Sequence, residues 1–270
     1  MRRDISKLLK DWPHEPGKLN ARLIEADDGT PRLQVRLDLG IIQMYLDGRP
    51  DGQASNGFPS LLEYHESRFD EAGRVDMGLE DIDEEESVDS PAERKPRPEP
   101  PPVGLTVDDC QALWEEGLQF AHRYIALATL DDHDRVVRDT VRNLRLLDFL
   151  IEHGPEDERS TLEQFRPYII LTRHRSLAAL MAKDSEPRAA VLMLDTGIDL
   201  LTKHYEAIGD PKAAESSSEI GSLRELRDAI SPPAPLTKRE DINAAMAKAV
   251  AEERYEDAAR LRDELKQLKD

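Results

Sequence analysis

The chain has 270 residues, of which 39% are hydrophobic, 5% aromatic and 34% charged, and its net charge at pH 7 is −19. A surface this acidic repels phosphate backbones, which argues against direct binding of nucleic acid. Cys110 is the only cysteine, so a disulfide within the chain and a cysteine-based zinc site are both excluded.

Residues 1–78 are predicted to form a small α+β module that begins with a short helix and a β-hairpin. Apolar side chains at helical spacing in residues 1–12 predict the helix. Residues 19–26 and 33–39 predict two strands, because they flank a run of turn-forming residues at 27–30.

The module continues beyond the hairpin. The alternation of apolar and polar residues changes phase at Gly40, which predicts either a β-bulge or a third short strand. Apolar side chains at helical spacing from 58 to 69 then predict a helix.

Residues 79–104 are predicted to be a disordered linker. Seven of the ten residues from Glu80 to Asp89 are acidic, and six prolines follow between 91 and 102. Such a segment cannot bury enough apolar surface to offset the entropy lost on ordering.

Residues 105–230 are predicted to be a helical domain. Apolar seams predict helices near 106–129, 132–153, 159–182, 187–208 and 216–230, and Thr106 with Asp109 is typical of an N-cap. The short connections imply antiparallel neighbours, in a bundle or in an array of the tetratricopeptide kind. The fold class is therefore mainly α.

Residues 236–270 are set apart by the proline-rich run at 231–235, and they form the last predicted element. Two short apolar stripes lie on either side of Tyr255, which predicts an antiparallel helical hairpin. The segment is close to neutral, with eight Lys and Arg residues against nine acidic ones, whereas residues 25–105 carry eight against twenty.

The hairpin resembles the UVR (UvrB/UvrC) motif, whose pattern includes a methionine, an aromatic–Glu–x–Ala–Ala–x–Leu core, Arg–Asp and an apolar tail. The resemblance implies a docking hairpin in which the partner-binding residues are Met246, Tyr255, Glu256, Ala258, Ala259, Leu261, Arg262, Asp263 and Leu265. It implies as partner a second UVR hairpin, from another copy of this chain, from a UvrB/UvrC-type repair protein or from a Clp-type chaperone. Neither the P-loop of UvrB nor the cysteine pairs of the stress regulator McsA occur in the sequence.

A row of four arginines is predicted on one face of the helix near 132–153: Arg135, Arg138, Arg142 and Arg145. It could bind an anion or an acidic partner. The interpretation favoured by the sequence is a solvated face whose ion-pair partners are Asp131, Asp139 and Asp148.

The sequence therefore predicts a cytoplasmic, non-catalytic adaptor protein. Nothing in it indicates a catalytic residue, a metal site or a cofactor, and no run of apolar residues is long enough for a secretory signal or a membrane span. The alternatives are an accessory factor of nucleotide excision repair, in contact with DNA or with UvrB/UvrC, and a stress-response regulator of the Clp/McsA kind.

Overall fold

The computed structural model describes residues 4–76, 104–156 and 159–230, and within the C-terminal segment residues 242, 245–249, 254, 256–257 and 259–262. Residues 1–224 form one compact unit and residues 225–270 a second. The predicted linker at 79–104 lies outside the described residues, apart from Gly104.

Three antiparallel strands form the sheet of the first unit, in the order β1 (Asn20–Glu25), β2 (Pro31–Arg36) and β3 (Ile41–Tyr45). The phase change at Gly40 therefore marks a third strand rather than a bulge. Gly40 turns the chain between β2 and β3, and its carbonyl accepts a hydrogen bond from Leu37 N at 2.9 Å.

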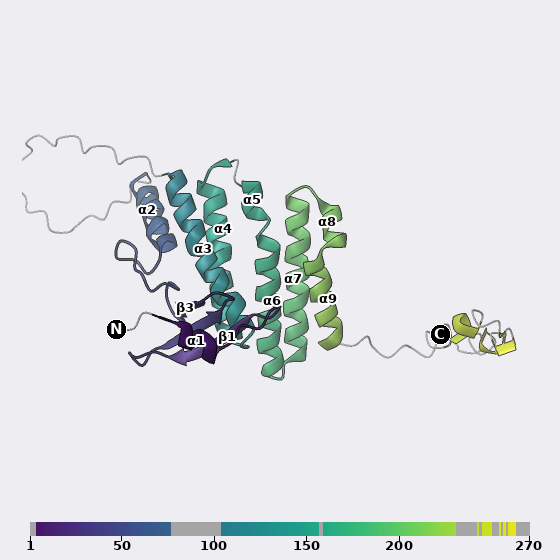
Figure 1. The fold of residues 1–270 in the computed structure, drawn as a ribbon. Helices are drawn as coiled ribbons and strands as arrows, with labels where there is room; N and C mark the ends of the chain where they lie inside the picture. The colour runs from purple at the N-terminus through teal and green to yellow at the C-terminus, as the bar shows by residue number, and fades with distance from the viewer. Residues whose placement is uncertain are drawn as a thin grey trace, which may run out of the picture. The chain divides into compact units, whose positions relative to one another are not determined.

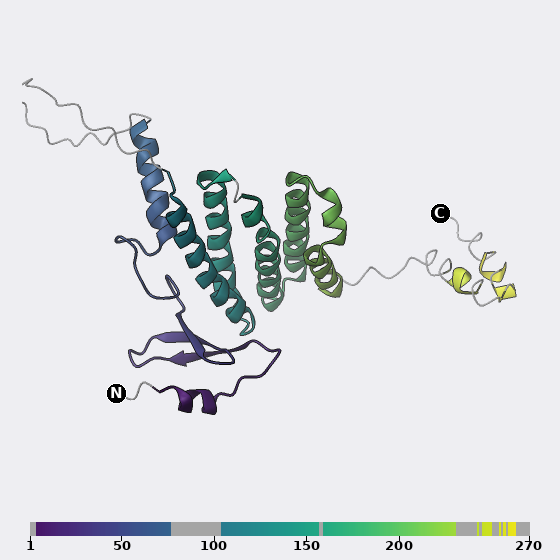
Figure 2. The ribbon, with the colours of Figure 1, turned by 45° about the horizontal axis from the view of Figure 1, so that its top comes forward.

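Both faces of the central strand β2 are buried, although only one of them is apolar. Leu33 and Val35 point to the helices, and Arg32 and Arg36 lie on the opposite face. That polar face is covered: Arg36 Nε donates to the Trp12 carbonyl at 2.7 Å, next to α1 (Ser6–Asp11). Figure 2 shows α1 on the side of the sheet that faces away from the helices.

The first unit continues with eight helices among the described residues: α2 (Leu61–Asp76), α3 (Val107–Ala128), α4 (His133–His153), α5 (Arg159–Glu163), α6 (Arg166–Lys183), α7 (Pro187–Ala207), α8 (Pro211–Ser216) and α9 (Ser218–Ile230), the last of which runs past residue 224. A capping box starts α3, since Thr106 Oγ1 accepts from Asp109 N at 3.1 Å and Asp109 Oδ2 accepts from Thr106 N at 3.0 Å. The predicted N-cap is thus confirmed.

One predicted helix is wrong in its extent. Residues 159–182 form two helices, because α5 ends at Glu163 and α6 begins at Arg166. Pro167 lies in the first turn of α6, the part of a helix where the missing N–H of proline costs no hydrogen bond. The chain therefore restarts a helix at this point instead of continuing α5.

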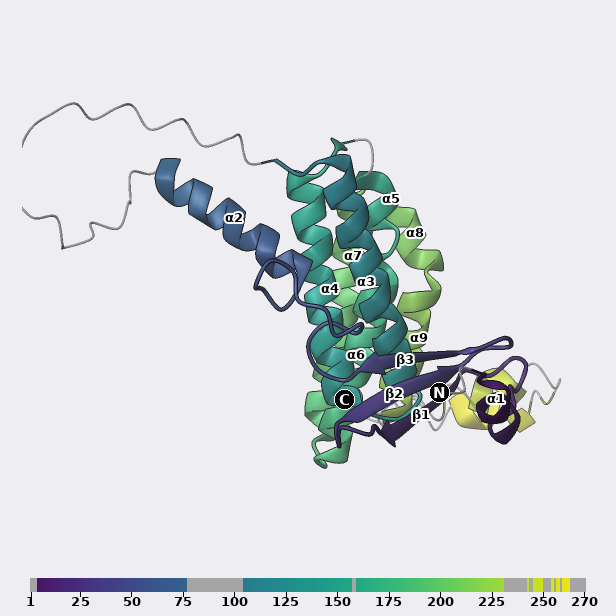
Figure 3. The same ribbon diagram turned by 60° about the vertical axis from the view of Figure 1, so that its left-hand side comes forward.

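The long helices lie side by side in chain order, so that α3 packs on α4, α4 on α6, and α6 on α7 (Figures 1 and 2). The arrangement is an open row of helices rather than a closed bundle. Figure 3 shows the sheet crossing the ends of α3 and α4.

The sheet and the helices share one hydrophobic core. Buried residues of β2 and β3 and of the loop after β3 pack with buried residues of α3 and α4: Leu33, Val35, Met44, Leu46, Tyr124, Ala126, Leu127 and Val136. A second cluster joins α2 to α3 and α4 through Leu62, Leu113 and Leu147, all nearly inaccessible to solvent. The bounds of 1–78 as a domain stay a prediction, but the apolar side chains of this range that are buried pack against residues from 105–153.

The shared core predicts that a change in the sheet destabilises the helices. Leu33→Ala removes a fully buried side chain and should lower the free energy of unfolding by about 2–5 kcal/mol. Far-UV circular dichroism in a urea titration measures the effect, since that signal comes mainly from the helices. Leu39→Ala is the control, because Leu39 is 86% exposed and its loss should change stability by less than about 0.5 kcal/mol. An unchanged helix transition in Leu33→Ala would mean that the sheet folds separately.

Candidate functional site

The predicted docking residues lie in the second unit, and the structure describes about half of them. Met246 and Leu261 are half-buried, and Arg262 is exposed, each within a helical stretch. Glu256 and Ala259 are also exposed and helical. The other four predicted contacts, Tyr255, Ala258, Asp263 and Leu265, lie outside the described residues.

The described part of this segment has the local features of two helices with a break between them. Ala249 is 1% exposed, and its carbonyl accepts a hydrogen bond from Arg254 N at 2.8 Å, after the first helical stretch. Asp257 then pairs with Arg254 at 3.0 Å and with Arg260 at 3.5 Å at the start of the second stretch. Apolar side chains are thus partly covered, while several charged ones are exposed.

The four arginines of α4 do lie along one side of the helix, but apart from Asp139 the acidic residues that engage them are ones that the sequence did not indicate. Arg135 pairs with Asp132 and Arg138 with Asp47, at 2.7 and 2.6 Å. Arg145 pairs with Glu66 at 2.8 Å, and a buried Arg142 pairs with Glu116. Of the predicted partners, Asp139 does pair with Arg138, at 3.0 Å, but Asp148 pairs with Arg166 at 2.8 Å. The face is therefore an ion-pair network between elements, and Arg142 is not solvated.

The centre of this network is a residue that sequence reasoning missed. Arg123 of α3 is 1% exposed, and its Nε and Nη2 donate to the two carboxylate oxygens of Asp139 at 2.6 and 2.8 Å. Its Nη1 donates to the carbonyls of Tyr45 and Gly48, at 2.9 and 2.8 Å. One guanidinium thus joins α3, α4 and the end of β3. The sequence does contain a signal for the burial of Arg123, because this residue lies on the same helical seam as the apolar Phe120 and Leu127.

Glu116 of α3 joins α2 to α3 and α4. This carboxylate is 1% exposed, and it pairs with Arg142 of α4 and accepts from the backbone N of Leu61 at 2.9 Å. Leu61 begins α2, whose first N–H groups have no partner within the helix. A buried acid of α3 therefore caps α2 and neutralises an arginine of α4.

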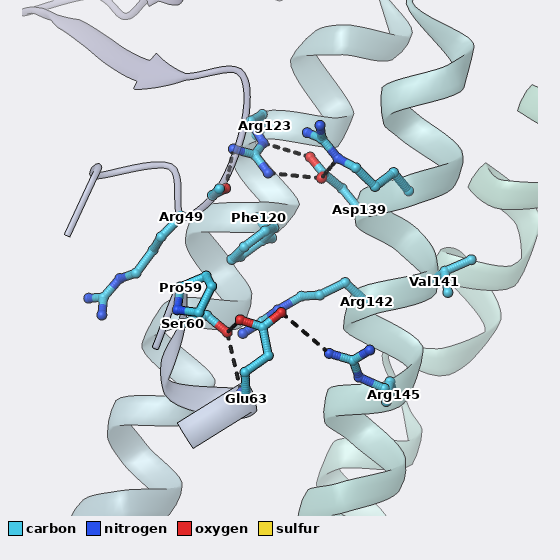
Figure 4. Close-up of a pocket in the computed structure, with 12 residues that line it drawn as sticks. Arg49, Pro59, Ser60, Glu63, Phe120, Arg123, Asp139, Val141, Arg142 and Arg145 are labelled. Carbon is cyan, nitrogen blue, oxygen red and sulfur yellow. Dashed lines mark hydrogen bonds and ion pairs between the residues drawn. The ribbon is translucent and has the colours of Figure 1, made fainter. Parts of the chain in front are cut away.

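A cavity of about 440 Å³ adjoins this network (Figure 4). It lies between the loop after β3, the start of α2, and helices α3 and α4. The ring of Phe120 forms part of its wall, and Arg142 Cζ lies 4.1 Å from the ring centroid. The residues that line it are Gly48, Arg49, Pro59, Ser60, Glu63, Phe120, Arg123, Arg138, Asp139, Val141, Arg142 and Arg145.

Burial and pairing shift the acidity of several groups here. Burial lowers the pKa of Arg142 to about 10, so the side chain stays charged at neutral pH. The hydrogen bond from Arg138 holds the pKa of Asp47 below its ordinary value, whereas burial raises the pKa of Glu66.

Two other kinds of site have no counterpart in the residues that the structure describes. Among them, no group of three or more His, Cys, Asp and Glu side chains is arranged to hold a metal ion. No helix in the described part of the chain is long and apolar enough to cross a membrane.

Residues 237–270 match the UVR family, described as the UvrB/uvrC motif. The chain therefore carries a UVR motif, as its sequence pattern predicted, and UVR motifs mediate protein interactions. No curated protein and no solved structure matches the chain significantly.

The buried pair of Arg123 and Asp139 gives a testable consequence. Asp139→Ala leaves a buried guanidinium without its counterion, and should lower the free energy of unfolding by about 3–5 kcal/mol. Asp148→Ala removes the same side chain from the same helix, where it is 64% exposed, and should cost less than about 1 kcal/mol. Urea titrations of both variants measure the difference. Equal losses of unfolding free energy would show that the buried Arg123–Asp139 pair contributes no more to stability than an exposed pair.

Proposed function

We propose that this chain is a non-catalytic adaptor protein that docks a partner protein through its C-terminal UVR hairpin. The observation that carries the proposal is the match of residues 237–270 to the UVR family. Such a hairpin is short and buries little apolar surface by itself, so docking supplies the burial that it lacks.

Charge supports the same function. Residues 236–270 are nearly balanced in charge, on a chain whose net charge is −19. A neutral segment approaches an acidic protein without the repulsion that the rest of the chain would meet. The exposed Arg262, which follows the half-buried Leu261, would set the polar register of the contact.

The partner we propose is a second UVR hairpin, either from another copy of this chain or from a different protein. A repair protein of the UvrB/UvrC type would place the adaptor in nucleotide excision repair. A Clp-type chaperone would instead place it in the control of stress-response proteolysis. The identity of the captured protein separates these two pathways.

Capture experiments test the docking hairpin. The full chain, a deletion of residues 236–270, and the variants Arg262→Glu and Arg260→Glu are each used as bait, and the bound proteins are identified by mass spectrometry. We expect the deletion and Arg262→Glu to lose the same partner. Arg260→Glu should keep it, because Arg260 is also exposed but occupies a variable position of the motif pattern.

Self-association is measured separately, by sedimentation of the full chain and of the deletion over a range of concentrations. A dimer that disappears with the deletion identifies a second copy as the partner. Retention of every captured protein and of any dimer by the deletion would contradict docking through the hairpin.

A further inference from the structure

Two hollows adjoin on the face that α3, α4 and α6 form together. The first, of about 430 Å³, lies between the start of α3, the end of α4 and α5. The second, of about 150 Å³, lies between α3, α4 and the start of α6. Trp114 and Phe165 line both, and their ring centroids are 4.6 Å apart. The two hollows therefore form one groove, which is crossed by an aromatic pair.

The groove is uncharged on a highly charged chain. Charged residues make up 34% of the sequence, yet none of the described residues that line the two hollows is charged. Several of its apolar side chains are open to solvent: Leu118 is 40% exposed, Phe165 42% and Tyr168 45%. Exposed apolar and aromatic side chains gathered in a concave surface indicate a place where another molecule binds.

Acidic residues surround the end of the groove where α3 starts and α4 ends. Asp108 is exposed on α3, and Glu152 and Glu156 are exposed at and after the end of α4. The described bases nearest to this end are Arg159, which is half-buried, and Arg166, which is engaged in ion pairs. The groove therefore favours a ligand that is uncharged along most of its length and basic at one end.

The spacing of the hollows matches one turn of a polyproline helix. Along α3, the first hollow centres on Gln111 and the second on Leu118, two helical turns apart, or about 10 Å. Three residues of polyproline helix span about 9 Å, so side chains three apart can enter the two hollows. Proline rings pack on aromatic side chains, and the unpaired carbonyls of such a helix accept from groups such as Gln164 and the Tyr168 hydroxyl.

We propose that this groove binds a proline-rich segment of a partner protein, with lysine or arginine next to the prolines at the acidic end of the groove. The partner is a different one from the protein that docks on the UVR hairpin. The adaptor would then hold two proteins at once, one at each of its two sites.

This chain contains a sequence of the required kind, with Arg94, Lys95 and Arg97 beside the prolines of 96–102. Pro102, however, is only five residues from Val107, at the acidic end of the groove. A segment entering there from the same chain would place its prolines beside the acids, and its bases about 15 Å or more beyond them. A separate chain can bind in the opposite direction, which is why the proposed ligand belongs to a partner.

Tryptophan fluorescence of the full chain tests the proposal, with a synthetic peptide of residues 91–103 as the probe. The chain has two tryptophans, and Trp12→Phe leaves Trp114 of the groove as the single emitter. The peptide has no aromatic residue. We expect its binding to shift the Trp114 emission to shorter wavelength and to weaken as salt is added. The same peptide with alanine in place of its six prolines should bind much more weakly.

Variants of the groove locate the binding. Tyr168→Ala and Leu118→Ala should each weaken binding of the proline peptide about fivefold, the effect of losing one apolar contact of about 1 kcal/mol. Leu192→Ala makes the same change as Leu118→Ala at a 60% exposed position of α7, and should leave binding unchanged. Thermal melting by circular dichroism checks that each variant is folded, and the comparison of the two peptides needs no change in the groove.

Tight binding of the proline peptide alone, weakened by the two groove variants and not by Leu192→Ala, supports the proposal. No emission shift at millimolar peptide overturns it, and equal binding of the alanine peptide overturns the assignment to proline. A full chain with serine in place of the six prolines between 91 and 102 is titrated in parallel. Binding by that variant alone would identify the chain's own segment as the occupant and overturn the assignment to a partner.

Discussion

The buried pair of Arg123 and Asp139 is the interaction on which the arrangement of the first unit depends. A charge removed from water costs several kcal/mol unless it is fully paired. Here the pairing needs three elements at once, because Arg123 comes from α3, Asp139 from α4 and the remaining acceptors from the end of β3. None of these elements can shift without leaving a buried charge unsatisfied. The apolar core contributes the buried hydrophobic surface, while the pair fixes how the sheet meets the helices.

Most elements of the first unit could be predicted because their signals are local, although α8 was not among them. Period-two alternation indicated the strands, and a third strand was one of the two interpretations of the phase change at Gly40. The partners of the α4 arginines could not be predicted, because spacing shows which residues share a face but not what that face meets. Glu116 and Arg123 on the apolar seam of α3 were the available evidence that this face is buried. The break before Arg166 was missed because Pro167 is compatible with a first turn as well as with a loop.

The UVR motif was found differently, by a residue pattern that its family shares. A pattern identifies a hairpin that mediates interactions, but it does not specify the partner, whose surface is encoded in another chain or in a second copy. The structure of the first unit adds a different kind of evidence, since a buried ion-pair network holds its sheet and helices together. In the proposed adaptor, the two parts have separate tasks: the UVR hairpin contacts the partner protein, and the sheet and helices form a stable scaffold.

Hydrogen–deuterium exchange of the full chain, alone and saturated with its captured partner, tests this division most directly. If the UVR hairpin is the docking element, amides within residues 237–270 become protected on binding, because their helices are covered by the partner. Amides of the sheet and of α3 and α4 should exchange at the same rate in both samples. New protection over the sheet and helices, with none in residues 237–270, would contradict the account.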